Sequence, residues 1–199
     1  MSAAPLAGLV LAGGQSSRMQ RDKAALEFGG ESQLARAVAL LRAHVPDTFV
    51  SVRADQQGTG ERARYPQVVD RLSGIGPAAG ILAALEQRPG HAWLVIAIDL
   101  PLLDGATLAR LIAHRDPSAP ATAYRSADNG LPEPLCAIWE PHARAPLAAF
   151  VAGGRDCPRK FLLTHGAALI DLAAPDALAN VNTPADYERA LERARRGAA

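Results

Sequence analysis

Residues 7–14 read AGLVLAGG, an almost unbroken apolar run that ends in two glycines. A strand with water on neither face has this composition, and the glycines turn the chain where the strand stops. Strands buried on both faces are typical of parallel sheets. The run therefore predicts a strand over residues 7–12 in the interior of a parallel sheet.

Helical and extended segments alternate along the rest of the chain. Apolar spacing and capping residues, such as Ser32 before the first helix and proline after its end, predict helices over 32–44, 78–86, 106–114, 143–152, 159–165 and 184–196. Short apolar runs predict strands over 48–52, 67–70, 93–98, 122–124, 136–139 and 168–170, with a turn at the Pro-Glu-Pro sequence 132–134. This βαβ rhythm predicts a Rossmann-like three-layer α/β/α fold with a mostly parallel central sheet.

Composition narrows the class of protein. A length of 199 residues predicts one domain over 1–199, and 21 basic against 20 acidic side chains give a net charge of +1, which attracts neither nucleic acid nor an anionic membrane. No run approaches the about 18 apolar residues of a membrane span, and the N-terminus lacks a signal-peptide pattern. The two cysteines form neither a disulfide framework nor a zinc motif. We therefore expect a cytoplasmic protein without nucleic-acid or membrane partners.

The segment after the first strand, residues 11–23 (LAGGQSSRMQRDK), combines glycines, hydroxyls and cations. Glycines let backbone amides approach a phosphate closely, and Arg18 and Lys23 can offset its charge. The segment matches neither the Walker A motif nor Gly-x-Gly-x-x-Gly. It is either a phosphate site or a solvated loop whose glycines merely turn the chain.

Aspartates end two of the expected strands. Asp99 follows the most apolar strand, where a carboxylate is costly without compensation. It is either a Mg²⁺ ligand, since this ion prefers one or two carboxylates plus substrate phosphates, or a cap of its own turn. Asp70 is either part of the same site or the ion-pair partner of Arg71. Ligands of such sheets bind at the carboxyl ends of the strands, so Gly13, Asp70 and Asp99 are the expected site.

The remaining candidates carry weaker signals. Residues 74–80 (GIGPAAG) either offer bare backbone to a base or sugar or form an ordinary helix start with Pro77 in the first turn. Cys136 and Cys157 have no histidine and acid in a motif, which favours simple thiols over nucleophiles. The histidines fall near helix ends or loops, which favours surface positions over catalysis.

Several motifs follow one another in a specific order: LAGG (11–14), RM (18–19), DK (22–23), Asp70, GPAAG (76–80), DLPLL (99–103), PEPL (132–135) and NVNTP (180–184). In this order the chain resembles the molybdenum cofactor guanylyltransferases from about residue 7 to about residue 190. These enzymes belong to the nucleotidyltransferases with a sheet of the nucleotide-diphospho-sugar transferase type.

The resemblance implies an activity. The protein would transfer GMP from GTP to the terminal phosphate of molybdopterin, usually already carrying molybdenum, and release pyrophosphate with Mg²⁺ as cofactor. GTP and molybdopterin would be its substrates, and transient contacts with proteins that deliver molybdopterin or with molybdoenzymes are expected. No covalent protein nucleophile is needed, because the acceptor phosphate itself attacks the α-phosphorus.

The resemblance also assigns roles to residues, with the N-terminal part binding nucleotide and the C-terminal part binding the acceptor. The nucleotide residues would be Leu11, Ala12, Gly13, Gly14, Lys23, Asp70, Gly76, Gly80 and Asp99. The catalytic residues would be Arg18, Lys23 and Asp99, with Asp99 holding Mg²⁺. Asn182 would lie on the pterin side, and the basic run of Arg155, Arg159 and Lys160 would receive the acceptor phosphate.

Three positions depart from the family pattern. Gln20-Arg21 stands where glycine commonly follows Arg-Met, Arg53 where asparagine is frequent, and Ile98 where cysteine is frequent. Gly13 favours guanine, because the sibling cytidylyltransferases typically read Leu-Ala-Ala-Gly. The alternatives are cytidylyl transfer to the same acceptor, nucleotidyl transfer to a sugar phosphate, and a non-catalytic nucleotide-binding module.

Overall fold

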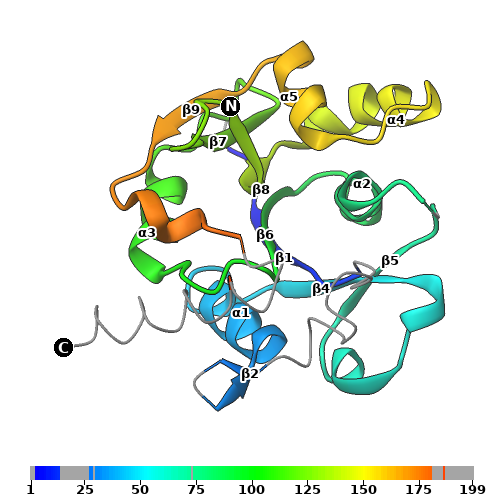
Figure 1. The fold of residues 1–199 in the computed structure, drawn as a ribbon. Coiled ribbons are helices and arrows are strands. Elements are labelled where there is room, and N and C mark those ends of the chain that lie inside the picture. Colours follow the sequence, from blue (N-terminus) through cyan, green and yellow to red (C-terminus); the bar gives the residue numbers. More distant parts are fainter. Residues whose placement is uncertain (1–2, 14–26, 29, 73, 181–185, 187–199) are drawn as a thin grey trace.

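The computed structural model describes residues 3–13, 27–28, 30–72, 74–180 and 186. Within these residues, seven strands form one sheet in the order β5-β4-β1-β6-β8-β7-β9 (Figure 1). The strands of the sheet are β1 (Leu6–Leu11), β4 (Thr48–Arg53), β5 (Gln67–Asp70), β6 (Ala92–Ala97), β7 (Ala121–Arg125), β8 (Pro132–Trp139) and β9 (Ala168–Asp171). A separate small hairpin pairs β2 (Glu27–Phe28) with β3 (Glu31–Ser32).

The sheet is mostly parallel, as predicted. Parallel pairs join β1 to β4 and to β6, β4 to β5, and β7 to β9. Among the described strands of this sheet, only β8 runs antiparallel to its neighbours, β6 and β7. The predicted buried strand is β1, whose residues Leu9 and Val10 are completely buried.

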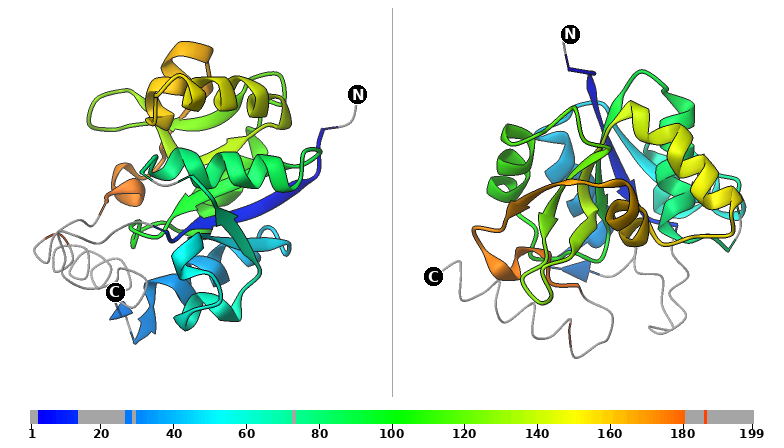
Figure 2. Two further views of the ribbon diagram at one scale, coloured as in Figure 1. Left: turned by 90° about the vertical axis from the view of Figure 1, so that its right-hand side faces the viewer. Right: turned by 90° about the horizontal axis from the view of Figure 1, so that it is seen from above.

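Helices cover both faces of the sheet, as Figure 2 shows. One core contains residues of α1 (Gln33–Arg42) and α3 (Gly105–Ala113), and the other contains residues of α2 (Pro77–Gln87), α4 (Arg144–Ala152) and α5 (Pro158–His165). Side chains alternate between these cores along β6, with Leu94 in the first and Trp93 in the second. The three-layer α/β/α prediction is confirmed.

Helix starts follow from short local signals. Ser32 caps α1 by accepting a hydrogen bond from the Ala35 N–H at 3.0 Å, as expected from the sequence. Asp104 caps α3 in the same way through the Thr107 N–H at 2.8 Å. Short 3-10 turns complete the connections: η2 (Ala54–Gln56), η3 (Gly60–Arg64), η4 (Pro141–Ala143) and η5 (Pro175–Leu178).

The turn predicted at residues 132–134 is wrong, because these residues belong to β8. Ala123 of β7 lies opposite Ala137, yet the next residue, Tyr124, lies opposite Glu133. A bulge in β8 therefore contains Pro134, whose nitrogen has no proton to donate to the sheet. Of the helix predicted over 184–196, only position 186 is described, and it is helical.

Two further observations bear on the predictions from composition. Cys136, which is buried, and Cys157, which is half-buried, are both free thiols. No helix in the described part of the chain has the length and apolar character needed to cross a bilayer.

Candidate functional site

A pocket of about 400 Å³ opens at the carboxyl ends of β1, β4, β5 and β6. The chain runs from β1 outward through β4 to β5 and then returns to place β6 on the other side of β1. Open α/β sheets bind their ligands at such a reversal of strand order. The volume suits a small-molecule ligand, whose sites typically measure about 300–1,000 Å³.

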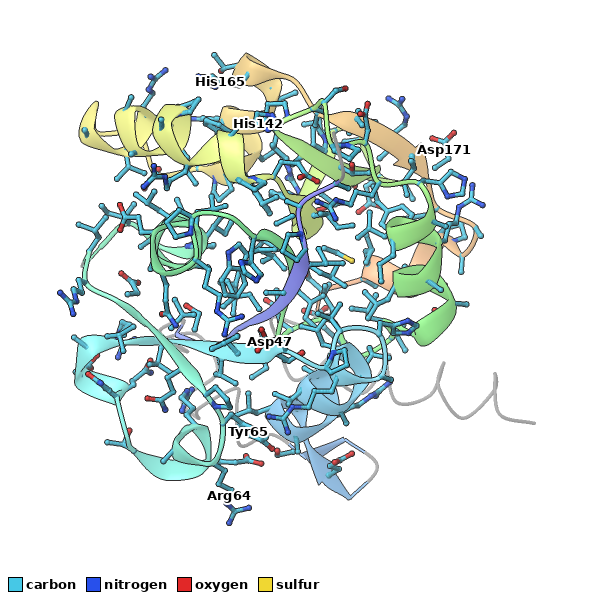
Figure 3. All side chains as sticks on the ribbon, turned by 180° about the vertical axis from the view of Figure 1, so that it is seen from behind. Asp47, Arg64, Tyr65, His142, His165 and Asp171 are labelled. Carbon is cyan, nitrogen blue, oxygen red and sulfur yellow. The ribbon has the colours of Figure 1, made fainter. Side chains whose placement is uncertain are left out.

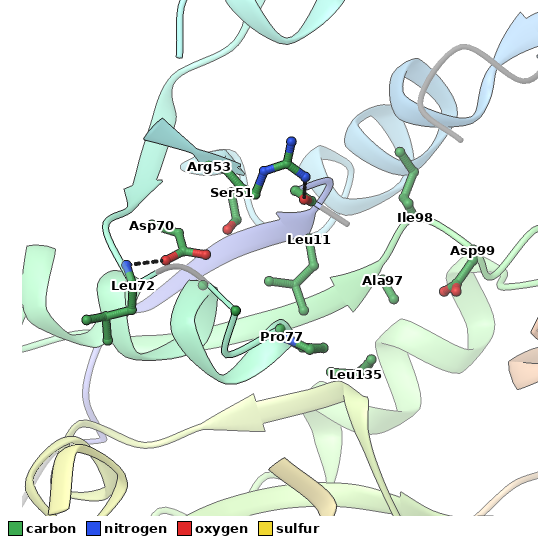
Figure 4. A pocket seen from close by; sticks show the side chains of 14 residues that line it. Leu11, Ser51, Arg53, Asp70, Leu72, Pro77, Ala97, Ile98, Asp99 and Leu135 are labelled. Atoms are coloured by element: carbon green, nitrogen blue, oxygen red, sulfur yellow. Dashed lines mark hydrogen bonds between the residues drawn. The ribbon is translucent and has the colours of Figure 1, made fainter. Parts of the chain in front are cut away.

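The expected strand-end residues meet in this pocket. Gly13, Asp70 and Asp99 all line it, although they lie far apart in sequence. Figure 4 shows Asp70 and Asp99 on opposite sides, with Leu11 between them. Gly76 and Gly80 also line the pocket, whereas Ala12 is buried and is not part of the lining.

Some predicted residues lie outside the part of the chain that the structure describes. These residues are Gly14, Arg18, Lys23 and Asn182. Their assigned roles stay predictions.

Asp70 is a half-buried acid at the end of β5. Its carboxylate accepts a hydrogen bond from the Leu72 N–H at 2.8 Å. Burial raises the pKa of Asp70 above its ordinary value, while this hydrogen bond and the Arg53 charge act in the opposite direction. No Asp70–Arg71 contact occurs among the ion pairs between described residues, so the ion-pair alternative is not what the structure shows.

Asp99 lies two residues beyond β6, all six residues of which are buried. The strand pairing continues to this point, because the Ile98 N–H donates to the Leu11 carbonyl at 3.3 Å. Within the described ranges, no group of three or more His, Cys, Asp or Glu side chains could hold a metal ion. Among the described residues, the acids that line the pocket are Asp70 and Asp99. Mg²⁺ typically takes one or two carboxylates and completes its coordination with oxygens of water and ligand.

The start of α2 forms one wall of the pocket. Gly76 precedes Pro77 with φ of 62° and ψ of −144°, a conformation that favours glycine. A Cβ at Gly80 would lie 2.5 Å from the Ser51 Oγ and 2.8 Å from the Leu11 Cδ2. The glycine at position 80 therefore lets α2 pack directly against β1 and β4. Residues 76–80 form an ordinary helix start with Pro77 in the first turn, and Gly76, Pro77 and Gly80 of this start also line the pocket.

Two arginines that sequence reasoning did not place in the site contact the end of β1. Arg62 is 6% exposed and donates from Nε and Nη2 to the Ala12 carbonyl at 3.1 and 2.9 Å. Arg53 donates from Nη1 to the Gly13 carbonyl at 2.9 Å. Its Nε and Nη2 each lie 2.9 Å from an oxygen of Asp55, and this contact lowers the pKa of the Asp55 carboxyl.

Arg53 departs from the family pattern at a position where asparagine is frequent near the base, and it lines the pocket. Arg62 stands in no motif. Arg62 is 50 residues from its partner Ala12. Arg62 lies in η3 between β4 and β5, so its contact with the end of β1 follows only once the sheet order β5-β4-β1 is known.

The predicted basic run lies on and just before α5 and does not line the pocket. Arg155 is exposed, and its guanidinium carbon lies 4.2 Å from the centre of the Phe150 ring. Arg159 is held by the Pro132 carbonyl at 3.0 Å and by Glu133 at 2.8 Å, whereas Lys160 is exposed.

No histidine belongs to the lining of this pocket among the described residues. His142 and His165 lie at the opposite end of the molecule from Arg64 and Tyr65, as Figure 3 shows. The His165 ring stacks on Phe161 with ring centres 4.2 Å apart, which gives it a packing role.

Known proteins resemble this chain over most of its length. The model of the MobA-like NTP transferase domain matches residues 8–168. A probable molybdenum cofactor guanylyltransferase from Opitutus terrae is 35% identical, with 94% of this chain and 96% of that protein covered.

A molybdenum cofactor biosynthesis bifunctional protein from Synechocystis sp. is 39% identical over 94% of this chain. The chain spans about half of that protein's length, 54%. The crystal structure of molybdopterin-guanine dinucleotide biosynthesis protein A from Archaeoglobus fulgidus superposes with a TM-score of 0.78 at 23% identity, covering 95% of this chain and 98% of that one. The predicted fold of the nucleotide-diphospho-sugar transferase type is confirmed.

Proposed function

The chain belongs to the family of MobA-like NTP transferase domains, and from this we propose that it transfers GMP from GTP to the terminal phosphate of molybdopterin. The products would be molybdopterin guanine dinucleotide and pyrophosphate. One observation carries the proposal: Gly13, Asp70 and Asp99 converge on a pocket at the carboxyl edge of the sheet. The names of relatives at 35–36% identity, molybdenum cofactor guanylyltransferases, support guanylyl transfer.

The reaction is an in-line displacement at the α-phosphorus of GTP. An oxygen of the acceptor phosphate forms a bond to this phosphorus while the bond to the β-phosphate bridging oxygen breaks, and pyrophosphate leaves. The protein has to position the two substrates and stabilise the charge that grows on pyrophosphate. Within this proposal, the nucleoside lies against Leu11, Asp70 and the start of α2, and Arg18 and Lys23 stabilise the leaving group.

Mg²⁺ belongs to the same proposal, with Asp99 as its protein ligand. Asp99 suits the ion, because it is a half-buried carboxylate that lines the pocket, and Mg²⁺ with one or two protein carboxylates takes its other ligands from water and substrate oxygens. When bound, the ion would supply positive charge to the phosphate oxygens. Asp99 itself supplies one carboxylate at a position that the β1–β6 pairing fixes.

The acceptor side is proposed to involve Asn182, Arg155 and Lys160. Arg155 and Lys160 are exposed cations, and the Arg159 charge is already balanced by Glu133. The proposal also includes contacts with proteins that deliver molybdopterin or accept the product. It places the protein in the cytoplasm. The two free thiols support a reducing compartment.

A competition experiment tests the function. Purified protein, Mg²⁺ and molybdopterin are mixed with equimolar GTP and CTP, and the dinucleotide product is identified by mass while pyrophosphate release is followed. Omission of molybdopterin and addition of a chelator are the controls. A guanine dinucleotide formed only in the complete mixture supports the proposal.

Other outcomes are equally decisive. A cytosine dinucleotide would preserve the mechanism but overturn the interpretation of Gly13. If no pyrophosphate is released, the acceptor assignment is wrong, and sugar phosphates become the next substrates to test. Nucleotide binding without pyrophosphate release for any acceptor would identify a non-catalytic module.

A further inference from the structure

Arg62 holds the backbone where β1 ends and the glycine pair at 13–14 begins. We propose that Arg62 is a positioning residue, which orients the peptide group between Ala12 and Gly13 and thereby sets the affinity for GTP. The proposal rests on the proposed function for the identity of the nucleotide.

The geometry of the contact is specific. Two N–H groups of Arg62, on Nε and Nη2, converge on the Ala12 carbonyl oxygen at 3.1 and 2.9 Å, and the side chain is buried. Burial of a guanidinium costs free energy, and buried charges are a poor way to stabilise a fold. The two hydrogen bonds reach the residue directly before Gly13, which lines the pocket, so Arg62 restrains the backbone that leads into the pocket wall.

The geometry of the peptide group explains how the contact between Arg62 and Ala12 affects Gly13. A carbonyl and the next N–H belong to one planar trans group and point in opposite directions. Because Arg62 holds the Ala12 carbonyl, the Gly13 N–H is directed away from Arg62. Arg53 donates to the Gly13 carbonyl, so Gly13 is restrained on both sides. Glycine would otherwise leave this backbone unusually free, and an ordered set of amides loses less entropy when it binds an anion.

The rest of the fold keeps Arg62 in place. Its own carbonyl accepts a hydrogen bond from the Gln67 side-chain amide at 2.9 Å, at the start of β5. The neighbouring Glu61 accepts a hydrogen bond at 2.6 Å from Ser32, the N-cap of α1. Contacts with β5 and with the N-cap of α1 therefore fix the backbone around Arg62, in addition to the contact of its side chain with Ala12.

The chain offers a matched control at the other end of the same strand. Arg115 donates from Nη1 to the Ala4 carbonyl at 2.8 Å, just before β1, and its other nitrogens bind Glu140. Its side chain is 11% exposed, and it does not line the pocket. Arg115 thus makes a similar contact with the backbone beside β1, at the end of the strand away from the pocket.

The experiment compares Arg62→Met, Arg62→Lys and Arg115→Met with the wild type. Thermal unfolding gives Tm, calorimetric titration with GTP and Mg²⁺ gives Kd, and dinucleotide formation gives kcat and KM for both substrates. We expect Tm to fall in both methionine variants. Only Arg62→Met should raise Kd and KM for GTP, by about tenfold or more, the scale for losing hydrogen bonds from a charged group. The KM for molybdopterin should stay unchanged.

Arg62→Lys keeps the charge and can restore one hydrogen bond, so it should recover most of the GTP affinity. If Arg62→Met does not fold, a several-fold weaker GTP affinity of Arg62→Lys at wild-type Tm would support the proposal. An unchanged GTP affinity in folded Arg62 variants, or an equal loss in Arg115→Met, would overturn it. If the wild type forms no dinucleotide, the proposed function fails, yet the GTP affinities still decide the role of Arg62. A wild type that binds no GTP overturns both.

Discussion

Arg53 and Asp70 occupy paired positions in the parallel ladder of β4 and β5, at the edge of the sheet on which the pocket opens. The positive charge of Arg53 favours the ionised form of Asp70, but burial has the larger effect and raises the pKa of Asp70. The pocket therefore holds a carboxylate whose ionisation the fold opposes. Ionisable residues in a pocket whose pKa the surroundings shift are candidates for a functional role.

The first prediction concerns the pH dependence of stability in Asp70→Asn. The pKa of Asp70 is higher in the folded protein than its reference value of 3.8, so folding favours the protonated form. The resulting cost is absent below the unfolded-state pKa, grows as pH rises, and is complete above the folded-state pKa. Asparagine keeps the oxygen that accepts from the Leu72 N–H and removes the charge. Tm should therefore rise at about pH 7 and change little at about pH 3.

Thermal unfolding of both proteins at the two pH values checks this expectation. An equal gain in Tm at both would show that ionisation of Asp70 is not the cause. Affinity for GTP, measured in parallel at neutral pH, should fall if Asp70 contacts the nucleoside.

The second prediction separates two aspartates that follow β6. Asp99→Asn should lower turnover by at least about a hundredfold, the scale for losing a charge-stabilising group, with little change in Tm. Asp104→Ala should leave turnover unchanged but cost about 1 kcal/mol of stability, because it removes the cap of α3. Steady-state kinetics and thermal unfolding on both variants give the comparison. Full activity of Asp99→Asn would eliminate the metal assignment.

The third prediction concerns the contact between α2 and the sheet. Gly80→Ala should destabilise the protein by about 1–3 kcal/mol, because the new methyl group would overlap the Ser51 Oγ and the Leu11 side chain. Ser51→Ala removes one of these contacts, so the double variant should recover part of the loss. Gly90→Ala is the control, since a Cβ there meets no atom within 4 Å. Chemical denaturation measures the four variants and the wild type, and additive losses in the double variant would contradict the packing account.

The fourth prediction tests the interpretation of Gly13 as the position that favours guanine. A Cβ at this glycine would lie 3.4 Å from the Arg53 backbone nitrogen and 3.5 Å from its Cγ, which are ordinary contacts. Gly13→Ala should therefore fold like the wild type while its preference shifts from GTP towards CTP. The ratio of kcat/KM for the two nucleotides is the measurement. An unchanged ratio at unchanged Tm would remove Gly13 from the specificity determinants.

The sheet could be predicted from sequence where the signals are local. The apolar pattern of β1, the capping residue Ser32, the aspartate that ends β5 and the aspartate after β6 each lie within a few residues of the feature they determine. The antiparallel insertion of β8 could not be predicted in this way, because a bulge accommodates Pro134. Proline signals a break in the ladder, and whether that break is a turn or a bulge depends on a partner strand that the local sequence does not contain.

The site was predictable to the extent that strand ends share one edge of a sheet. That rule brought Gly13, Asp70 and Asp99 together correctly. The contacts of Arg53 and Arg62 with backbone carbonyls were not predictable, because a carbonyl acceptor is present at every residue and leaves no mark in the sequence. Side chain to backbone contacts across 40 or 50 residues become visible only in the folded chain.

The central place of β1 has a consequence for synthesis on the ribosome. This apolar strand is translated before its partners, and one of them, β6, pairs Ala92 with Leu6, 86 positions later (92 − 6). At about 5–20 residues per second, the edge of β1 that pairs with β6 waits roughly 4–17 s for its partner to be made. During that interval the nascent chain carries an apolar strand with one unpaired edge, which is a site for aggregation. Chaperone binding to the nascent chain in this interval is therefore expected to matter more for the yield of this protein than for its final stability.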